Sequence, residues 1–211
     1  MQESAPKKAI IIGGGIGGVT AAIALKRAGL DVTVYERAEE LREVGSGLPL
    51  WTNALRALHK IGLTDELEQL GAQVTAGSIS TWSGDILADL RNEKLLKRLG
   101  TINIVAHRAE LLALLLKTLG QDRVQLGTTC VGFTQDASGV CARFADGQEA
   151  RGDVLIGADG IRSVIRAQLF GLTKPRYAGY TCWRGLAHTT RTGLETWAWG
   201  KGCQFGITPM S

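Results

Sequence analysis

The chain has 211 residues, of which 45% are hydrophobic, and its net charge of +4 comes from 24 basic and 20 acidic residues. This length allows one domain, or one domain and part of a second, with a large apolar core. The charges form no blocks, which argues against nucleic acid as a partner. The four cysteines include no CxxC pair, which predicts no metal site and reduced thiols in a cytoplasmic protein.

The N-terminal segment has one feature of a signal peptide. Lys7 and Lys8 precede an uncharged run from Ala9 to Leu25, as a charged region precedes an apolar one in such peptides. Glycines interrupt this run, and it is shorter than the span of about 20 residues that crosses a membrane. We therefore expect a folded element here, with neither a signal peptide nor a membrane span.

The same segment predicts a strand, a helix and a second strand. The apolar run Ala9–Ile12 is typical of a strand buried on both faces of a parallel sheet. Helix-forming residues follow over Ile16–Ala28, with Gly29 as the C-terminal cap, and Val32–Tyr35 forms the next strand. This order predicts a βαβ unit and an α/β, Rossmann-like fold.

Further elements follow in chain order. A hairpin is expected over Ser78–Leu90, with Ser83-Gly84 at its turn, and a three-stranded antiparallel meander over Thr128–Arg151. After Pro175 the sequence predicts short, aromatic-rich strands of a second, antiparallel sheet. The remaining predicted elements are helices at Ala54–Ile61, Asp65–Leu70, Ala109–Leu119 and Ser163–Leu169, and a buried strand at Val154–Ile156.

The turn after the first strand has the spacing GxGxxG. Gly13 allows the tight turn, Gly15 allows a pyrophosphate to approach the backbone, and Gly18 allows the helix to pack against the strand. The N–H groups at the helix N-terminus, those of Ile16 and Gly17 among them, favour a bound phosphate. The turn therefore predicts a dinucleotide site.

An acidic residue ends the second strand of this unit. Glu36 lies where a carboxylate accepts hydrogen bonds from the hydroxyl groups of an adenosine ribose. Arg37 follows it, and an arginine near the ribose would also suit a 2′-phosphate. Neither residue decides whether the dinucleotide is FAD or NAD.

A second motif favours FAD. The segment from Gly157 to Arg166, GADGIRSVIR, resembles the GADGxxSxxR motif of the FAD-dependent aromatic hydroxylases, the family of salicylate, urate and hydroxybenzoate hydroxylases and of zeaxanthin epoxidase. The resemblance implies that Asp159 and Gly160 lie beside the cofactor. A strand that ends in Asp-Gly before a serine-capped helix is consistent with that position.

Other segments resemble the same family. The segment from His107 to Leu112 is similar to its HRxxL motif, which implies that Arg108 reaches the phosphate and ribityl region of FAD. Val44–Leu48 is similar to its VGxGI stretch, which implies that Gly47 lies beside the flavin, although the Pro-Asn-Ala that usually follows is replaced here by Thr52-Asn53-Ala54. Cys130 falls where the family places a backbone amide against adenine. Tyr177–Gly185 is similar to YxGYxxWRG, the first long strand of the substrate domain.

The resemblance implies an FAD-binding domain over residues 1–75 and 92–174, and part of a substrate-binding domain over residues 76–91 and 175–211. It implies a monooxygenase that uses NAD(P)H as a transient co-substrate to hydroxylate or epoxidise a small aromatic or alkene molecule. It names no catalytic side chain. The alternatives are a non-catalytic FAD-binding fragment that needs a partner chain, and another flavoenzyme such as a halogenase or an isoprenoid reductase.

One further motif of the family does not occur in this sequence. A Gly-Asp pair that binds the ribityl chain is expected beyond Ser211, together with the remaining strands of the substrate sheet. The sheet that begins after Pro175 is therefore expected to have unpaired edges. Such edges predict self-association or a complementing chain.

Overall fold

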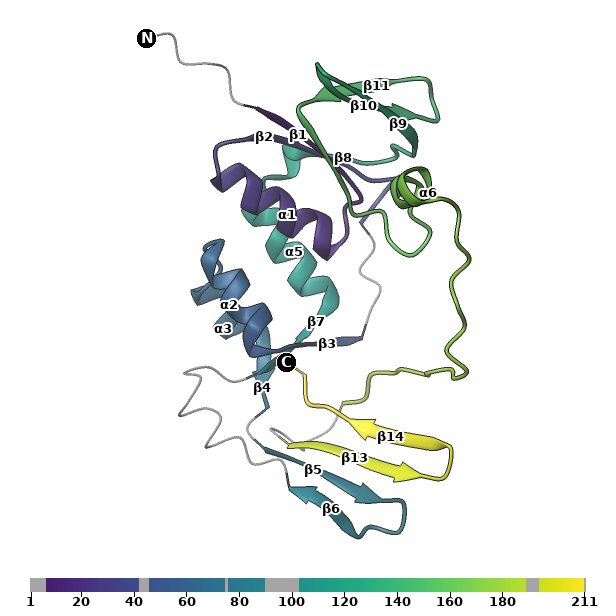
Figure 1. The fold of residues 1–211 in the computed structure, drawn as a ribbon. Coiled ribbons are helices and arrows are strands. Elements are labelled where there is room, and N and C mark those ends of the chain that lie inside the picture. The colour runs from purple at the N-terminus through teal and green to yellow at the C-terminus, as the bar shows by residue number, and fades with distance from the viewer. Residues whose placement is uncertain (1–6, 42–45, 75, 90–102, 189–193, 211) are drawn as a thin grey trace. The chain divides into compact units, whose positions relative to one another are not determined.

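The structure is a computed structural model that describes residues 7–41, 46–74, 76–89, 103–188 and 194–210. It consists of two compact units. The first contains residues 1–42 and 112–182, and the second contains residues 43–111 and 183–211. Figure 1 shows the elements of both.

The first unit is built on a parallel sheet in the order β12-β1-β2-β8. Its strands are β1 (Lys8–Ile12), β2 (Asp31–Tyr35), β8 (Val124–Gln125) and β12 (Val154–Gly157), and helix α1 (Ile16–Arg27) connects β1 to β2. Four of the five residues of β1 are buried, because strands pair with it on both edges and other elements cover its faces. The predicted βαβ unit is confirmed.

An antiparallel meander packs against this sheet. It consists of β9 (Cys130–Asp136), β10 (Gly139–Phe144) and β11 (Glu149–Gly152), with glycines of positive φ at Gly139 and Gly147 in its turns. The predicted meander is therefore confirmed. Helix α6 (Val164–Phe170) contributes to the apolar cluster of this unit. The buried members of that cluster are Ile10, Ile12, Cys130, Phe133, Val140, Ala142, Phe144 and Ile165.

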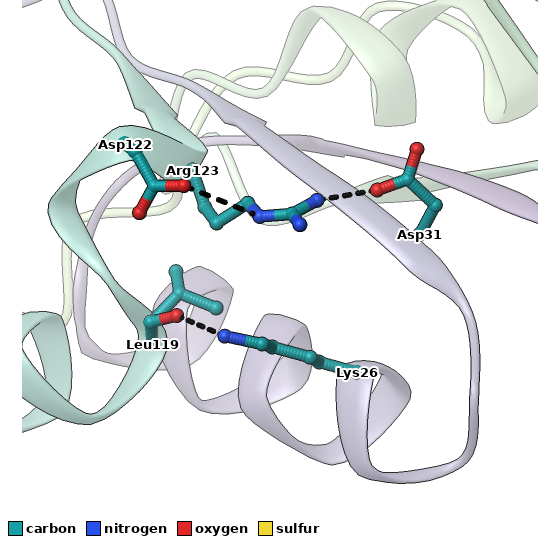
Figure 2. A network of polar contacts seen from close by, with 5 residues as sticks. All are labelled: Lys26, Asp31, Leu119, Asp122 and Arg123. Carbon is teal, nitrogen blue, oxygen red and sulfur yellow. Dashed lines mark hydrogen bonds and ion pairs between the residues drawn. The ribbon is translucent and has the colours of Figure 1, made fainter.

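Polar contacts stabilise the βαβ unit at the C-terminal end of α1, as Figure 2 shows. The Lys26 Nζ atom, in the last turn of α1, donates a hydrogen bond to the Leu119 carbonyl oxygen at a distance of 2.6 Å. Leu119 ends helix α5 (Arg108–Leu119), so the cation lies where the helix dipole favours it. Arg123, in the short 3₁₀ helix η1 (Gln121–Arg123), pairs with Asp31 at the start of β2. These contacts stabilise the end of α1 opposite to the glycine turn.

The second unit contains two small sheets. The first has the order β14-β13-β5-β6, and the second has the order β3-β7-β4. The strands β5 and β6 form the predicted hairpin, although Leu90 lies outside the described residues. The elements are β3 (Gly47–Leu50), α2 (Thr52–Lys60), α3 (Asp65–Leu70), β4 (Gly71–Gln73), β5 (Ala76–Thr81), β6 (Ile86–Asp89), β7 (Ile104–His107), β13 (Leu194–Gly200) and β14 (Cys203–Ile207).

The strand expected over Tyr177–Gly185 is not observed. This segment has no strand assignment, and the side chains of Tyr177, Tyr180 and Trp183 are exposed. A strand needs a hydrogen-bonded neighbour, and no described strand pairs with this segment. After Pro175, the aromatic residues that lie in described strands are Trp197 and Trp199 in β13 and Phe205 in β14.

Candidate functional site

The glycines of the GxGxxG turn have two different kinds of surroundings. Gly13 has a φ of +111°, and a Cβ atom there would lie 2.3 Å from the Ala158 carbonyl oxygen. A Cβ atom at Gly18 would lie 1.9 Å from the Gly13 carbonyl oxygen. At Gly15, by contrast, a Cβ atom would meet nothing within 4 Å. Gly13 and Gly18 are therefore needed for packing, whereas Gly15 faces open space.

That space lies at the N-terminus of α1. Gly15 is the N-cap residue and offers no side-chain hydrogen bond, and the first turn of the helix contains no acidic residue. Gly17, like Gly15, would place a Cβ atom in open space. Backbone N–H groups at such a helix end attract an anion. The turn therefore fits a pyrophosphate held by the backbone around Gly15, Ile16 and Gly17.

Glu36 is tied directly to this turn. Its Oε2 atom accepts a hydrogen bond of 2.6 Å from the Gly14 N–H group, and its Oε1 atom accepts one of 3.0 Å from the Ala38 N–H group. Each carboxylate oxygen has a second lone pair that can accept a hydrogen bond from a hydroxyl group. The carboxylate is thus held beside the turn and can still bind a ribose. Arg37, the next residue, is exposed.

The Asp159-Gly160 corner lies next to the glycine turn, because β12 pairs with β1. The Ala158 N–H group donates to the Ile12 carbonyl oxygen at 2.7 Å, just before Gly13. The Asp159 Oδ2 atom accepts from the N–H groups of Val164 and Ile165, at 2.7 and 3.3 Å. Its Oδ1 atom is buried without a hydrogen-bond partner in the described part of the chain. A buried acceptor of this kind requires a donor, which a cofactor can supply.

The rest of the motif holds the corner in shape. The Ser163 Oγ atom accepts a hydrogen bond of 2.9 Å from the Arg166 N–H group and caps α6. The Arg166 guanidinium donates to the Ile161 carbonyl oxygen at 2.6 Å and to the Gly160 carbonyl oxygen at 3.4 Å. The serine and the arginine of the motif therefore stabilise the loop from within. The sequence motif contained Arg166 but did not indicate this function.

Cys130 begins β9, a strand that packs against α6. Its side chain is buried in the apolar cluster, and its thiol donates to the Gly132 carbonyl oxygen at 3.5 Å. Burial raises the pKa of the Cys130 thiol, and the nearby Asp159 carboxylate adds to the effect. A neutral, buried thiol is a poor nucleophile. This is consistent with the prediction that Cys130 contributes only its backbone.

The second unit brings two other predicted residues together. Strand β3 pairs with β7, so that Gly47 lies opposite His107. The Arg108 N–H group also donates to the Ser46 carbonyl oxygen at 3.4 Å. Arg108 and Gly47, which are far apart in the sequence, are therefore neighbours. Val44 and Gly45, the first residues of the same predicted motif, lie outside the described residues.

Two further features concern the described residues only. No group of three or more His, Cys, Asp or Glu side chains in that part of the chain is arranged to hold a metal ion. No helix there is long and apolar enough to cross a membrane.

This chain is similar to known proteins. A family model described as FAD binding domain matches residues 7–182. The aurachin C monooxygenase/isomerase of Stigmatella aurantiaca is 37% identical over 95% of this chain and 53% of its own length, and an FAD-dependent urate hydroxylase of Klebsiella pneumoniae is 36% identical over 97% and 55%. The chain thus spans about half the length of these curated relatives.

A solved structure extends the similarity to three dimensions. The crystal structure of Klebsiella pneumoniae HpxO complexed with FAD and uric acid is similar to this chain with a TM-score of 0.91 and 34% sequence identity. The similarity covers 97% of this chain and 54% of that one. The predicted α/β fold with its parallel and antiparallel sheets is confirmed.

Proposed function

This chain belongs to the FAD binding domain family, and from that membership we propose that it supplies the FAD-binding part of an NAD(P)H-dependent monooxygenase. The proposed reaction is hydroxylation or epoxidation of a small, electron-rich aromatic or alkene substrate. The observation that carries the proposal is the open space at Gly15, in a turn where Glu36 is bonded to the neighbouring Gly14 and Ala158, just before the Asp159-Gly160 corner, lies against Gly13. Relatives that are monooxygenases and hydroxylases support the reaction class.

We assign the cofactor contacts as follows. The backbone of Gly15, Ile16 and Gly17 holds the pyrophosphate, with Gly13 and Gly18 shaping the turn. Glu36 binds the adenosine ribose, with Arg37 beside it, and the Cys130 backbone contacts the adenine. Gly160 faces the pyrophosphate with its backbone, the Asp159 carboxylate lies beside it and accepts from a hydrogen-bond donor of the cofactor, and Gly47 and Arg108 contact the flavin side.

Bound FAD would supply the redox chemistry, in which NAD(P)H is the electron donor and molecular oxygen the oxidant. The residues of this chain bind and orient the cofactor. Glu36 and Asp159 each direct a carboxylate toward groups that donate hydrogen bonds, while the N-terminus of α1 offers a positive field to the phosphates. We assign no catalytic side chain to the chain.

The sheet β14-β13-β5-β6 supports the proposed substrate-binding part. Strand β13 pairs in parallel with β5, so that residues 194–199 lie beside residues 76–81 although they are distant in sequence. This pairing supports a proposed substrate-binding domain made from residues 76–91 and 175–211. We propose residues 1–75 and 92–174 as the FAD-binding domain, a division that differs from that of the compact units, in which residues 43–75 belong with this sheet.

The same sheet supports the proposal of a complementing chain or self-association. Strands β14 and β6 are its outer strands, and Phe205, Ile207 and Ile86 are exposed along them. Unpaired strand edges with apolar side chains favour pairing with another chain. We also propose a cytoplasmic location, on the ground that Cys130, Cys141 and Cys203 form no disulfide bond in the described part of the chain.

Titration of the chain with nucleotides tests the proposed site. We expect FAD and ADP to bind with similar affinity, in the micromolar range, because both would be held by the turn and by Glu36. Quenching of flavin fluorescence measures the affinity for FAD, and displacement of bound FAD by ADP measures the affinity for ADP. Absence of binding for both would contradict the proposal, and FAD that ADP fails to displace would show that contacts to the flavin dominate.

The reaction class is tested by adding NAD(P)H and candidate phenols to the chain together with any polypeptide that completes it. Substrate-stimulated oxidation of NAD(P)H with an oxygenated product supports the monooxygenase. FAD binding without oxidation supports the non-catalytic fragment. A chlorinated or reduced product would instead support a halogenase or an isoprenoid reductase.

Substitution of Asp159 separates its two functions. Asp159→Ala should lower the stability by about 1–2 kcal/mol, since the Val164 and Ile165 N–H groups lose their acceptor. Asp159→Asn keeps an acceptor oxygen and should retain most of that stability, yet it should weaken FAD binding because the charge is gone. Urea unfolding and FAD titration measure the two effects. Wild-type affinity in Asp159→Asn would restrict the residue to capping the helix.

A further inference from the structure

Helix α6 is attached to the meander by one side chain. The Gln168 Oε1 atom accepts a hydrogen bond of 3.0 Å from the Phe133 N–H group, and its Nε2 atom donates one of 2.5 Å to the Phe133 carbonyl oxygen. Phe133 lies in β9, the outer strand of the meander, which is paired only with β10 among the described strands. The amide of Gln168 thus occupies both backbone groups of one residue, as a neighbouring strand would.

The local packing leaves room for this contact. A Cβ atom at Gly132 would lie 3.0 Å from the Gln168 Oε1 atom, so the glycine leaves room for the amide. Gln168 itself is exposed, but Phe133, whose backbone groups it contacts, is buried, so the two hydrogen bonds satisfy the polar groups of a buried residue.

The other end of α6 is attached to the Asp159-Gly160 corner. The Asp159 carboxylate accepts from the first N–H groups of the helix, and the Arg166 guanidinium holds the carbonyl oxygens of Gly160 and Ile161. In the first turn of the helix, Ile165 is buried close to Gly157, where a Cβ atom would lie 2.9 Å from the Ile165 side chain. The helix and the corner are therefore attached to each other by several contacts.

We propose that Gln168 is a positioning residue for the cofactor. Its amide sets β9, and with it the backbone of Cys130 at the start of that strand, at a defined distance from the Asp159-Gly160 corner. The adenine contact and the pyrophosphate contact are thereby held in one geometry by α6. The inference rests on the proposed FAD site, and it assigns Gln168 no direct contact with the cofactor.

A glutamate at this position tests the proposal through pH. In Gln168→Glu the ionised carboxylate still accepts from the Phe133 N–H group but repels the carbonyl oxygen, whereas the protonated form can donate to it. We expect FAD affinity to be about tenfold below wild type at about pH 7.5 and to return toward it at about pH 4.5, as the new side chain is protonated. In Gln168→Ala the FAD affinity should be below that of the wild type by the same factor at both pH values.

Gln135→Glu is the matched control. Gln135 lies in β9, the strand that contains Phe133, and its side chain is exposed. The variant therefore introduces the same charge but keeps the contact between Gln168 and Phe133. Its affinity should follow that of the wild type at each pH. Circular dichroism at each pH gives the folded fraction, so that affinities are compared for folded protein.

The outcomes separate the two proposals. Failure of the wild type to bind FAD would contradict the site itself. Binding by the wild type with unchanged affinity in Gln168→Ala and Gln168→Glu would overturn the positioning inference alone. Reduced stability with unchanged affinity of the folded protein would also overturn it, because the contact would then be structural only.

Discussion

Gly15→Val is expected to remove FAD binding while leaving the chain folded. Gly15 has a φ of −73° and a ψ of 176°, an extended conformation that valine readily adopts, and its Cβ atom would meet no protein atom within 4 Å. The branched side chain would occupy the space assigned to the pyrophosphate. We expect an affinity loss of about 100-fold or more, which corresponds to about 3 kcal/mol. Flavin fluorescence titration and thermal unfolding measure the two properties.

Three comparison variants make this result specific. Gly15→Ser supplies a favoured N-cap residue and should still block binding, which separates occlusion from poor capping. Gly185→Val makes the same change at an open position and should bind normally. Gly18→Ala should unfold, because its Cβ atom would lie 1.9 Å from the Gly13 carbonyl oxygen. Normal FAD affinity in Gly15→Val would show that the phosphates bind elsewhere.

Glu36→Ala is expected to weaken FAD and ADP binding by about 1–3 kcal/mol, roughly fivefold to 150-fold. The ribose hydroxyl groups would lose a charged acceptor. The N–H groups of Gly14 and Ala38 would also lose theirs, which loosens the turn itself. Glu39→Ala, an exposed acidic residue nearby, should have little effect and serves as the control.

A second ligand distinguishes the ribose contact from the loosened turn. The wild type should prefer ADP to 2′-deoxy-ADP, because only ADP offers the 2′-hydroxyl group to Glu36. In Glu36→Ala the two ligands should bind equally. A preference that persists in the variant would assign the hydroxyl to another residue and leave Glu36 with its contact to the turn alone.

Local patterns in the sequence were sufficient for most of the first unit. The GxGxxG spacing, the apolar run Ala9–Ile12 and the alternation within the meander each predicted an element that the structure contains. Such patterns are informative because helices and strands have fixed periods, and because glycine alone tolerates the close contacts at Gly13 and Gly18. Motif spacing likewise identified Glu36 and Asp159 as candidates.

Pairing between distant short segments was not predictable in this way. Strands β3 and β7 are four residues each and more than fifty residues apart, and the pairing that places Gly47 opposite His107 has no signal in either segment. The prediction of a strand at Tyr177–Gly185 was wrong for a related reason. Aromatic residues favour strands, but a strand also needs a neighbouring strand with which to form hydrogen bonds, and composition does not show whether one is present.

The sequence by itself therefore determined which residues form the glycine turn, the acidic strand end and the Asp-Gly corner. Only the tertiary structure decided what their polar atoms contact. The order β12-β1-β2 places Ala158 against Gly13, the path of the chain after β2 lets Glu36 reach the Gly14 N–H group, and the packing of α6 on β9 joins Gln168 to Phe133 across thirty-five positions. Periodicity depends on neighbours in the chain, whereas a hydrogen bond depends on neighbours in space, and the packing of the sheets decides which those are.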